Sequence, residues 1–274
     1  MKVISRIYAA LVLLVLYIPI LVLVLFSFNS SGNTGVFTGF SLYWYVELFR
    51  SAETFNALRN TLVLAVSAAS LSTVIGTAAA VGLNRMRSRA IKATITSVTN
   101  VPMMNPDIVT GVAMMLLFVL VGTMLGLQDK LSFWTLLIAH TTFCLPYVML
   151  SVNPRIQQMD RALPEAAQDL GCTPVQSFFR VELPNIASGI VSGFIMAFTL
   201  SLDDFVISYF TSGSDFQTLP LLIYSMTKKE VKPDIYALST LIIVAVLLLL
   251  ILSNVISARG ERKRVAKESG ARKP

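Results

Sequence analysis

Three aspartates lie inside long apolar stretches of this sequence, where acidic side chains are costly. Asp107 follows a segment bounded by Pro102 and Pro106, and Asp203 and Asp204 are adjacent in a later stretch. Insertion scales put an aspartate at mid-membrane at about 2.5–3.5 kcal/mol, and no Lys or Arg lies within these stretches to neutralise the three. Such carboxylates predict a negatively charged path for a cationic substrate. The alternative is that they cap helices or hydrogen-bond between them.

A second chemically distinctive group is a polar, helix-forming segment between two apolar stretches. It contains Glu165, Ala166, Ala167 and Gly171, and Leu183-Pro184 follows it. The two alanines would let a short helix fit closely into a partner's cleft, and we expect Gly171 to end that helix. The sequence contains no Gly-x-x-x-x-Gly-Lys-Ser/Thr loop for nucleotide phosphates. Any energy input therefore has to come from another subunit through the 153–184 loop, and we expect no catalytic residues here.

The elements that position both groups are predicted to be membrane-spanning helices. Apolar residues make up 55% of the 274 and charged residues 14%, with a mean hydropathy of +0.71. A hydrocarbon core about 30 Å thick needs roughly 20 apolar residues per helix. Six stretches qualify, at about 7–28, 61–83, 95–121, 133–152, 186–210 and 237–257. We therefore predict an all-α membrane protein formed by one domain, residues 1–274.

The orientation of these helices follows from their basic flanks. Sixteen of the 22 lysines and arginines fall on one side if the N-terminus is cytoplasmic. Cytoplasmic loops carry the excess of Lys and Arg, so both termini and the 153–184 loop are predicted to be cytoplasmic. The net charge of +7 is explained by this bias, and we expect no nucleic-acid partner.

Five smaller features complete the predictions. Ala68, Ser72, Gly76 and Ala80 recur every four residues, a spacing that favours close helix packing. Pro102 and Pro106 predict a kinked third helix beside a cavity. Trp44 is predicted to anchor a short interfacial helix, with substrate contact as the alternative. Cys144 and Cys172 are expected to be unpaired packing residues, and the only histidine, His140, has no Cys or carboxylate at metal-ligand spacing, so no metal is expected.

Several motifs together resemble one family. Glu-Ala-Ala, three residues, Gly, nine residues and an aliphatic-x-Leu-Pro run is similar to the signature loop of bacterial binding-protein-dependent ABC importer permeases. Within that family the chain resembles the permease subunits of spermidine/putrescine importers. The matching stretches are Pro106-Asp107-Ile108-Val109, Thr142–Pro146, Glu165–Gly171, Phe198–Asp204 and Leu219-Pro220-Leu221.

The resemblance implies a type I importer fold with six spans in the bacterial inner membrane. It implies that Glu165, Ala166, Ala167, Gly171, Leu183 and Pro184 couple to a separate ATPase dimer, which binds the ATP and magnesium. It also implies a second permease subunit, a periplasmic substrate-binding protein and a polyamine substrate. An ABC permease for another small solute, an ion-coupled secondary carrier and a purely structural membrane subunit remain as alternatives.

Overall fold

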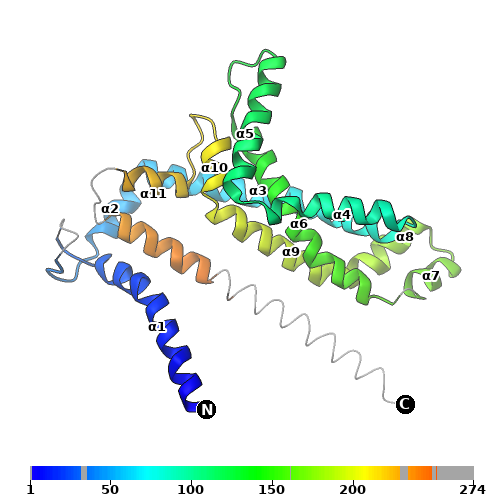
Figure 1. The fold of residues 1–274 in the computed structure, drawn as a ribbon, viewed down its shortest axis with the longest axis horizontal. Helices are drawn as coiled ribbons and strands as arrows, with labels where there is room; N and C mark the ends of the chain where they lie inside the picture. The colour runs from blue at the N-terminus through cyan, green and yellow to red at the C-terminus, as the bar shows by residue number, and fades with distance from the viewer. Residues whose placement is uncertain (1, 32–35, 161, 229–233, 249–250, 252–274) are drawn as a thin grey trace. The chain divides into compact units, whose positions relative to one another are not determined.

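The structure, a computed structural model, describes residues 2–31, 36–160, 162–228, 234–248 and 251. Helices dominate it, and the described part contains no strand beyond a single bridge between Asn29 and Phe40 (Figure 1). The all-α prediction is therefore confirmed. The chain falls into two compact units, one from residues up to 59 with 218–248, the other centred on 60–217. Whether it behaves as one domain stays a prediction.

Five described helical segments are long and apolar enough to cross a membrane. They are Arg6–Phe26, Ala52–Arg85, Asp107–Met124, Phe133–Gln158 and Pro174–Asp203. A shorter apolar helix covers Asp234–Leu248, and the rest of the predicted sixth span, up to residue 257, lies outside the described residues. The chain is thus a multi-pass membrane protein by the length and composition of its helices, while the count of six stays a prediction.

The first unit contains α1 (Lys2–Phe26), α2 (Tyr43–Arg50), α11 (Leu219–Thr227) and the helix Asp234–Leu248. Its core is a cluster of buried aliphatic side chains, namely Leu48, Ala57, Leu219, Leu222 and Leu238. Leu48 lies on α2 and is the buried residue of that helix, so the short helix predicted after the first span exists.

The second unit is built on α6 (Phe133–Gln158), α9 (Leu183–Asp203) and the part of α3 (Ala52–Arg85) that follows residue 59. The small-residue face of α3 is buried, and a Cβ on Gly76 would lie 2.9 Å from Val148 Cγ1 of α6. On α9, a Cβ at Gly189 would lie 3.0 Å from the Ser151 carbonyl oxygen of α6. Small residues therefore let three backbones approach closely within this chain, which confirms the predicted packing face.

The third predicted span, 95–121, is wrong as one kinked helix. It is two helices, α4 (Arg89–Met104) and α5 (Asp107–Met124), with Asn105 and Pro106 extended between them. Pro106 has no N–H for the helix ladder and disfavours helical geometry at the residue before it, so the helix stops where a bend was expected. Pro102 remains inside α4. Beside the break lies a hollow of about 240 Å³ lined by residues of both helices.

The fifth predicted span, 186–210, is also interrupted. α9 ends at Asp203, Asp204 is extended, and α10 (Val206–Thr211) begins two residues later. α10 packs against the start of α5, where a Cβ on Gly111 would meet the Phe210 ring at 3.0 Å. The two interruptions therefore belong to helices that touch. The first interruption ends at Asp107, where α5 starts, and the second begins after Asp203, where α9 ends.

We expect a methyl group at Gly189 to disturb the α6–α9 contact. Gly189→Ala gains helix propensity of about 1 kcal/mol, but its Cβ would press on Arg155 Cγ and the Ser151 carbonyl oxygen, and overpacking typically costs about 1–3 kcal/mol. The matched control is Gly82→Ala on α3, where nothing lies within 4 Å of the new Cβ. The melting temperature of the purified protein should fall for Gly189→Ala and hold or rise for Gly82→Ala. Equal melting of the two variants would contradict the close packing.

Candidate functional site

Asp204 occupies the gap between α9 and α10 and caps the second helix. Its Oδ2 accepts a hydrogen bond from the Ser208 backbone N–H at 2.9 Å, and its Oδ1 accepts from the Ile207 N–H at 3.5 Å. The side chain is only 6% exposed. Helix ends leave backbone N–H groups without partners, and a carboxylate at that position satisfies them and complements the helix dipole. Asp204 therefore has the capping arrangement that was the alternative to a substrate role.

Asp203 and Asp107 differ from Asp204 because both side chains are exposed in this chain. Asp107 lies in the first turn of α5, which packs on α10, and Asp203 is the last residue of α9. Asp203 directly precedes Asp204, and α10, which follows Asp204, packs on the start of α5. The structure thus brings the three sequence-predicted acids into one region of the second unit. Two of them, Asp107 and Asp203, are exposed.

His140 is a polar residue of this region that sequence reasoning set aside. It is fully buried on α6, with its Nδ1 2.8 Å from Ser201 Oγ of α9 and its Nε2 3.0 Å from Ser208 Oγ of α10. The Asp204 Oδ2 atom lies 3.5 Å from Nε2. The signal was present, because a histidine inside an apolar span needs polar partners. Which serines would supply them could not be read from spacing.

The predicted coupling helix is present as α7 (Ala162–Asp169), and Gly171 ends it as expected. The Gly171 N–H donates to the Gln168 carbonyl oxygen at 2.9 Å, and the Cys172 N–H donates to that of Ala167 at 3.0 Å. This pair of bonds is a Schellman motif, which needs a left-handed residue after the helix. Gly171 supplies it with φ of +90°.

One contact within this loop and one contact to α3 fix its conformation. Ser177 Oγ, in the short helix α8 (Pro174–Ser177), donates to the Pro164 carbonyl oxygen at 3.2 Å. Arg85, at the end of α3, forms a 2.6 Å ion pair with Glu182, the last residue of the π-helical turn η1 (Phe178–Glu182). Leu183 and Pro184 come next and open α9. The loop is thus attached to α3 directly before it continues into the membrane helix.

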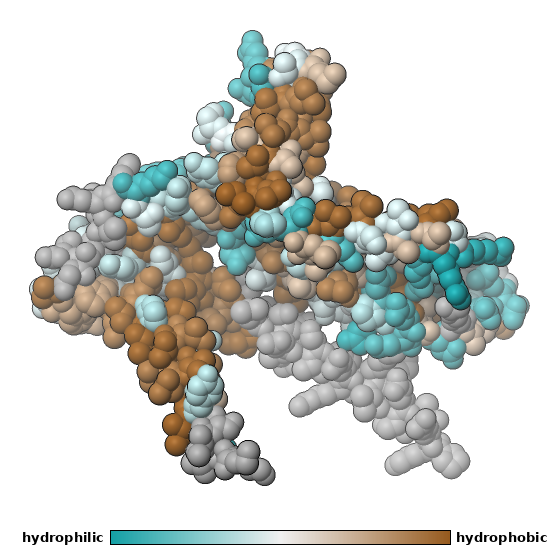
Figure 2. Space-filling view, viewed as in Figure 1, coloured by the Kyte–Doolittle hydropathy of each residue, from teal (hydrophilic) through white to brown (hydrophobic). Residues whose placement is uncertain are grey.

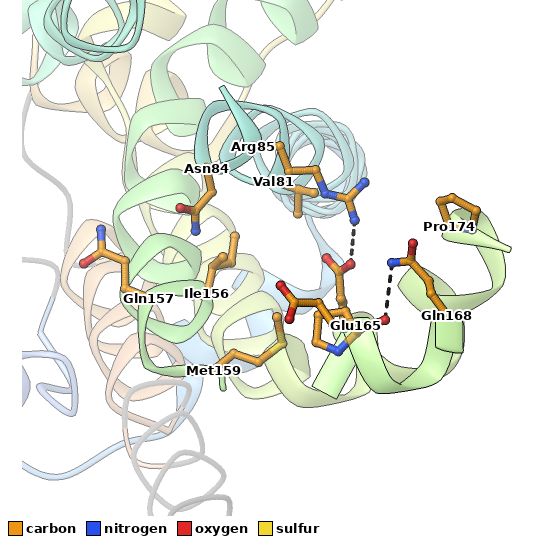
Figure 3. A pocket seen from close by; sticks show the side chains of 11 residues that line it. Val81, Asn84, Arg85, Ile156, Gln157, Met159, Glu165, Gln168 and Pro174 are labelled. Carbon is orange, nitrogen blue, oxygen red and sulfur yellow. Dashed lines mark hydrogen bonds and ion pairs between the residues drawn. The ribbon is translucent and has the colours of Figure 1, made fainter. Parts of the chain in front are cut away.

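A groove of about 400 Å³ lies between α7 and the ends of α3 and α6. Figure 3 shows Glu165 and Gln168 on one side, facing Asn84 and Arg85 of α3, together with Gln157 of α6 and Met159 directly after it. Gln168 Nε2 donates to the Pro164 carbonyl oxygen at 3.3 Å within α7. Ala166 lies on the exposed part of α7, while Ala167 is half-buried. Polar and apolar side chains line the groove together.

Apolar side chains also project from this loop into solvent. Leu170 is 88% exposed, and Leu163, Val175 and Phe179 are exposed as well. The surroundings of α7 and α8 are otherwise polar, whereas α5 is covered by apolar side chains (Figure 2). Large apolar residues grouped on a polar loop are typical of a surface that a partner covers.

The coupling loop and the acids are joined by one helix. α9 has 21 residues from Leu183 to Asp203, or roughly 30 Å at 1.5 Å per residue. Ser151 Oγ of α6 donates to the Gly189 carbonyl oxygen at 3.1 Å, and Cys144 Sγ donates to that of Ala197 at 3.4 Å. Both cysteines are free, as predicted. Hydrogen bonds thus hold α9 against α6 at two points along its length.

Trp44 belongs to the first unit. Its Nε1–H donates to the Asn29 carbonyl oxygen at 2.9 Å, which holds α2 against the loop that follows α1. The contact with a substrate and the interfacial anchor both stay predictions. Among the described residues, no group of three or more His, Cys, Asp or Glu side chains is arranged to hold a metal ion.

The fold formed by these helices is similar to that of a chain in a bacterial ABC transporter. The chain matches one from the crystal structure of a bacterial alginate ABC transporter in complex with alginate pentasaccharide-bound periplasmic protein. The TM-score is 0.72 at 15% identity, covering 94% of each chain. At that identity the likeness concerns the fold alone.

The family follows from sequence. The profile of the family described as "Binding-protein-dependent transport system inner membrane component" matches residues 72–265, and the chain belongs to this family. It is 40% identical to the putrescine transport system permease protein PotI of Escherichia coli strain K12, over 94% of this chain and 92% of that one. It is 41% identical to the spermidine/putrescine transport system permease protein PotC of Haemophilus influenzae, over 89% and 92%.

Proposed function

We propose that this chain is a permease subunit of an ABC importer that moves polyamines such as spermidine or putrescine into the cytoplasm. The observation that supports it most directly is the placement of the exposed Asp203 next to the capped Asp204, with the exposed Asp107 at the start of the helix that packs on α10. A polyamine is a flexible cation with separated amines, so it needs separated carboxylates and an apolar surface for its methylenes. The similarity to two polyamine permeases along most of the chain agrees with this chemistry.

This proposal requires three kinds of partner subunit, because a permease alone neither captures the substrate outside the membrane nor hydrolyses ATP. A second, PotB-like permease would complete the path, and a PotD-like periplasmic protein would deliver the substrate. A PotA-like ATPase dimer would bind ATP and magnesium, so ATP hydrolysis would reside outside this chain. Glu165, Ala166, Ala167, Gly171, Leu183 and Pro184 would form the docking face, and the exposed Leu163 and Leu170 extend it.

Alternating access would then proceed through α9. ATP binding favours one arrangement of the docking loop and hydrolysis favours another. Because α9 runs from Leu183 to Asp203, each arrangement of the loop gives a different position to the acids. The substrate path would open to one side and then to the other.

Topology in the bacterial inner membrane gives a direct prediction. With both termini cytoplasmic, a cysteine placed at Ser214, in the loop after α10, should react with an impermeant thiol reagent in intact cells. A cysteine at Ser88, in the loop between α3 and α4, should react only after permeabilisation. Both side chains are exposed, so accessibility reports the side of the membrane. Labelling of position 88 in intact cells would overturn this orientation.

The function itself is tested by uptake. Cells lacking their own polyamine importers, and supplied with this chain and the three partner types, should accumulate radiolabelled putrescine or spermidine. Omission of the ATPase should abolish accumulation, because ATP hydrolysis supplies the energy for uptake. An ion-coupled carrier would need no such subunit and would still accumulate the substrate. Accumulation that persists without the ATPase would exclude the proposed class, and uptake of other solutes but no polyamine would exclude the substrate.

A further inference from the structure

The hydrogen bonds of His140 connect three helices at the point where the fifth span is interrupted. The imidazole comes from α6, Ser201 lies in the last turn of α9, and Ser208 lies in α10. All three side chains are buried. α9 and α10 are the two pieces of chain on either side of Asp204. The imidazole therefore connects them through side chains at a point where the helical backbone hydrogen bonds are interrupted.

The polar groups around this imidazole fix how it bonds. Nε2 faces Ser208 Oγ at 3.0 Å and the Asp204 carboxylate at 3.5 Å, and both oxygens accept readily. A proton on Nε2 satisfies this side, and Nδ1 then accepts from the Ser201 hydroxyl at 2.8 Å. Buried polar groups that are fully paired hold one geometry, because each lost bond leaves an unpaired group in an apolar setting.

We propose that His140 is a positioning residue that separates the roles of the two adjacent aspartates. By bridging Ser201 and Ser208 it holds Asp204 inward as the cap of α10 and leaves Asp203 exposed. Neighbouring residues on a continuous helix would instead differ by a fixed rotation of about 100°. Because the Asp204 backbone is extended, with ψ of 119°, the directions of the two side chains are not tied to that helical rotation. The importance of Asp203 for transport rests on the proposed function; the positioning itself does not.

The position of Asp203 can be measured without a substrate. Asp203→Cys and, in a second chain, the exposed Ser214→Cys report thiol reactivity in the complex purified in detergent, with the label on the parent chain subtracted. We expect His140→Leu, which removes both hydrogen bonds, to change the ratio of the 203 to the 214 labelling rate by at least about fivefold. His140→Gln, which can donate and accept, should keep the ratio within about twofold.

Two further variants separate positioning from a general loss of packing. Cys144→Ala removes a buried contact from the same face of α6 to α9 but none to α10, and should leave the ratio unchanged. Ser208→Ala removes one bond and little volume, so it should shift the ratio partly, and should add nothing to His140→Leu because the bond is already absent. This variant keeps the test valid if His140→Leu does not assemble.

The outcomes distinguish the two proposals. An unchanged ratio in both His140→Leu and Ser208→Ala, or an equal shift in His140→Gln, would overturn the positioning role. In uptake assays, His140→Leu should raise the polyamine KM by at least about fivefold and reduce the maximal rate less. A shifted labelling ratio with an unchanged KM would support the positioning of Asp203 and remove it from the polyamine path.

Discussion

Replacing Asp107 or Asp203 with Asn should depress polyamine uptake by about tenfold in each case, and the double variant by about a hundredfold. Asn keeps the size and hydrogen-bonding capacity of Asp but removes its charge, so the change isolates the electrostatic attraction. Tenfold corresponds to about 1.4 kcal/mol, between the values for an exposed and for a buried ion pair. Near additivity is expected if each acid contacts a different amine of the substrate.

The matched control for these variants is Asp215→Asn. Asp215 is exposed in the loop after α10, where it accepts a hydrogen bond from Ser214. The substitution therefore removes one negative charge from the same unit but away from the three aspartates. Radiolabelled uptake at matched membrane expression is the measurement. Normal uptake by Asp107→Asn and Asp203→Asn, or an equal loss in Asp215→Asn, would contradict the cationic path.

Asp204→Asn should behave differently because its carboxylate caps a helix. The single amide oxygen of Asn replaces only one of the two carboxylate oxygens that accept N–H bonds here, and a buried N–H left without a partner costs about 1–3 kcal/mol. We therefore expect a lower melting temperature for Asp204→Asn and an unchanged one for Asp203→Asn. The adjacent pair, which the sequence presents as equivalent, is divided by burial.

The sequence was sufficient for features set by local chemistry. Composition and length predicted membrane helices, and Gly171 predicted the end of α7, because only a residue tolerant of positive φ closes that helix. The period-4 small residues of α3 predicted close packing. These patterns depend on residues within a turn or two of each other, so they can be read without knowing the partner element.

The interruptions could be located from sequence only in part. Pro106 marked the break after α4, but whether a proline bends a membrane helix or ends it depends on what satisfies the freed backbone groups. No proline marks the gap at Asp204. There the carboxylate takes the place of the interrupted helical hydrogen bonds by accepting from the N–H groups of Ile207 and Ser208. His140 was missed because its partners are 61 and 68 residues away. Tertiary contacts of that range leave no spacing pattern.

Gly171→Leu and Glu165→Ala should each abolish the ATP hydrolysis that loaded binding protein stimulates, while the chain still inserts into the membrane. Gly171 has φ of +90°, a conformation that costs an L-residue with a side chain about 1–2 kcal/mol, so a bulky residue would change the end of α7 and the surface around Leu170. Glu165 is exposed beside the groove, where it is available to a cationic partner residue. A loss of at least about tenfold in stimulated hydrolysis by the purified complex is the expected result.

The matched control for the glycine variant is Gly126→Leu. Gly126 also has positive φ, at +67°, and open space around its missing Cβ, as Gly171 does, but it lies just after α5. The two substitutions impose similar backbone strain in places that differ only in their relation to the docking loop. Stimulated hydrolysis should persist in Gly126→Leu. If it falls equally in both glycine variants, strain alone explains the loss; if it survives Gly171→Leu and Glu165→Ala, α7 is not the element that couples this permease to its ATPase.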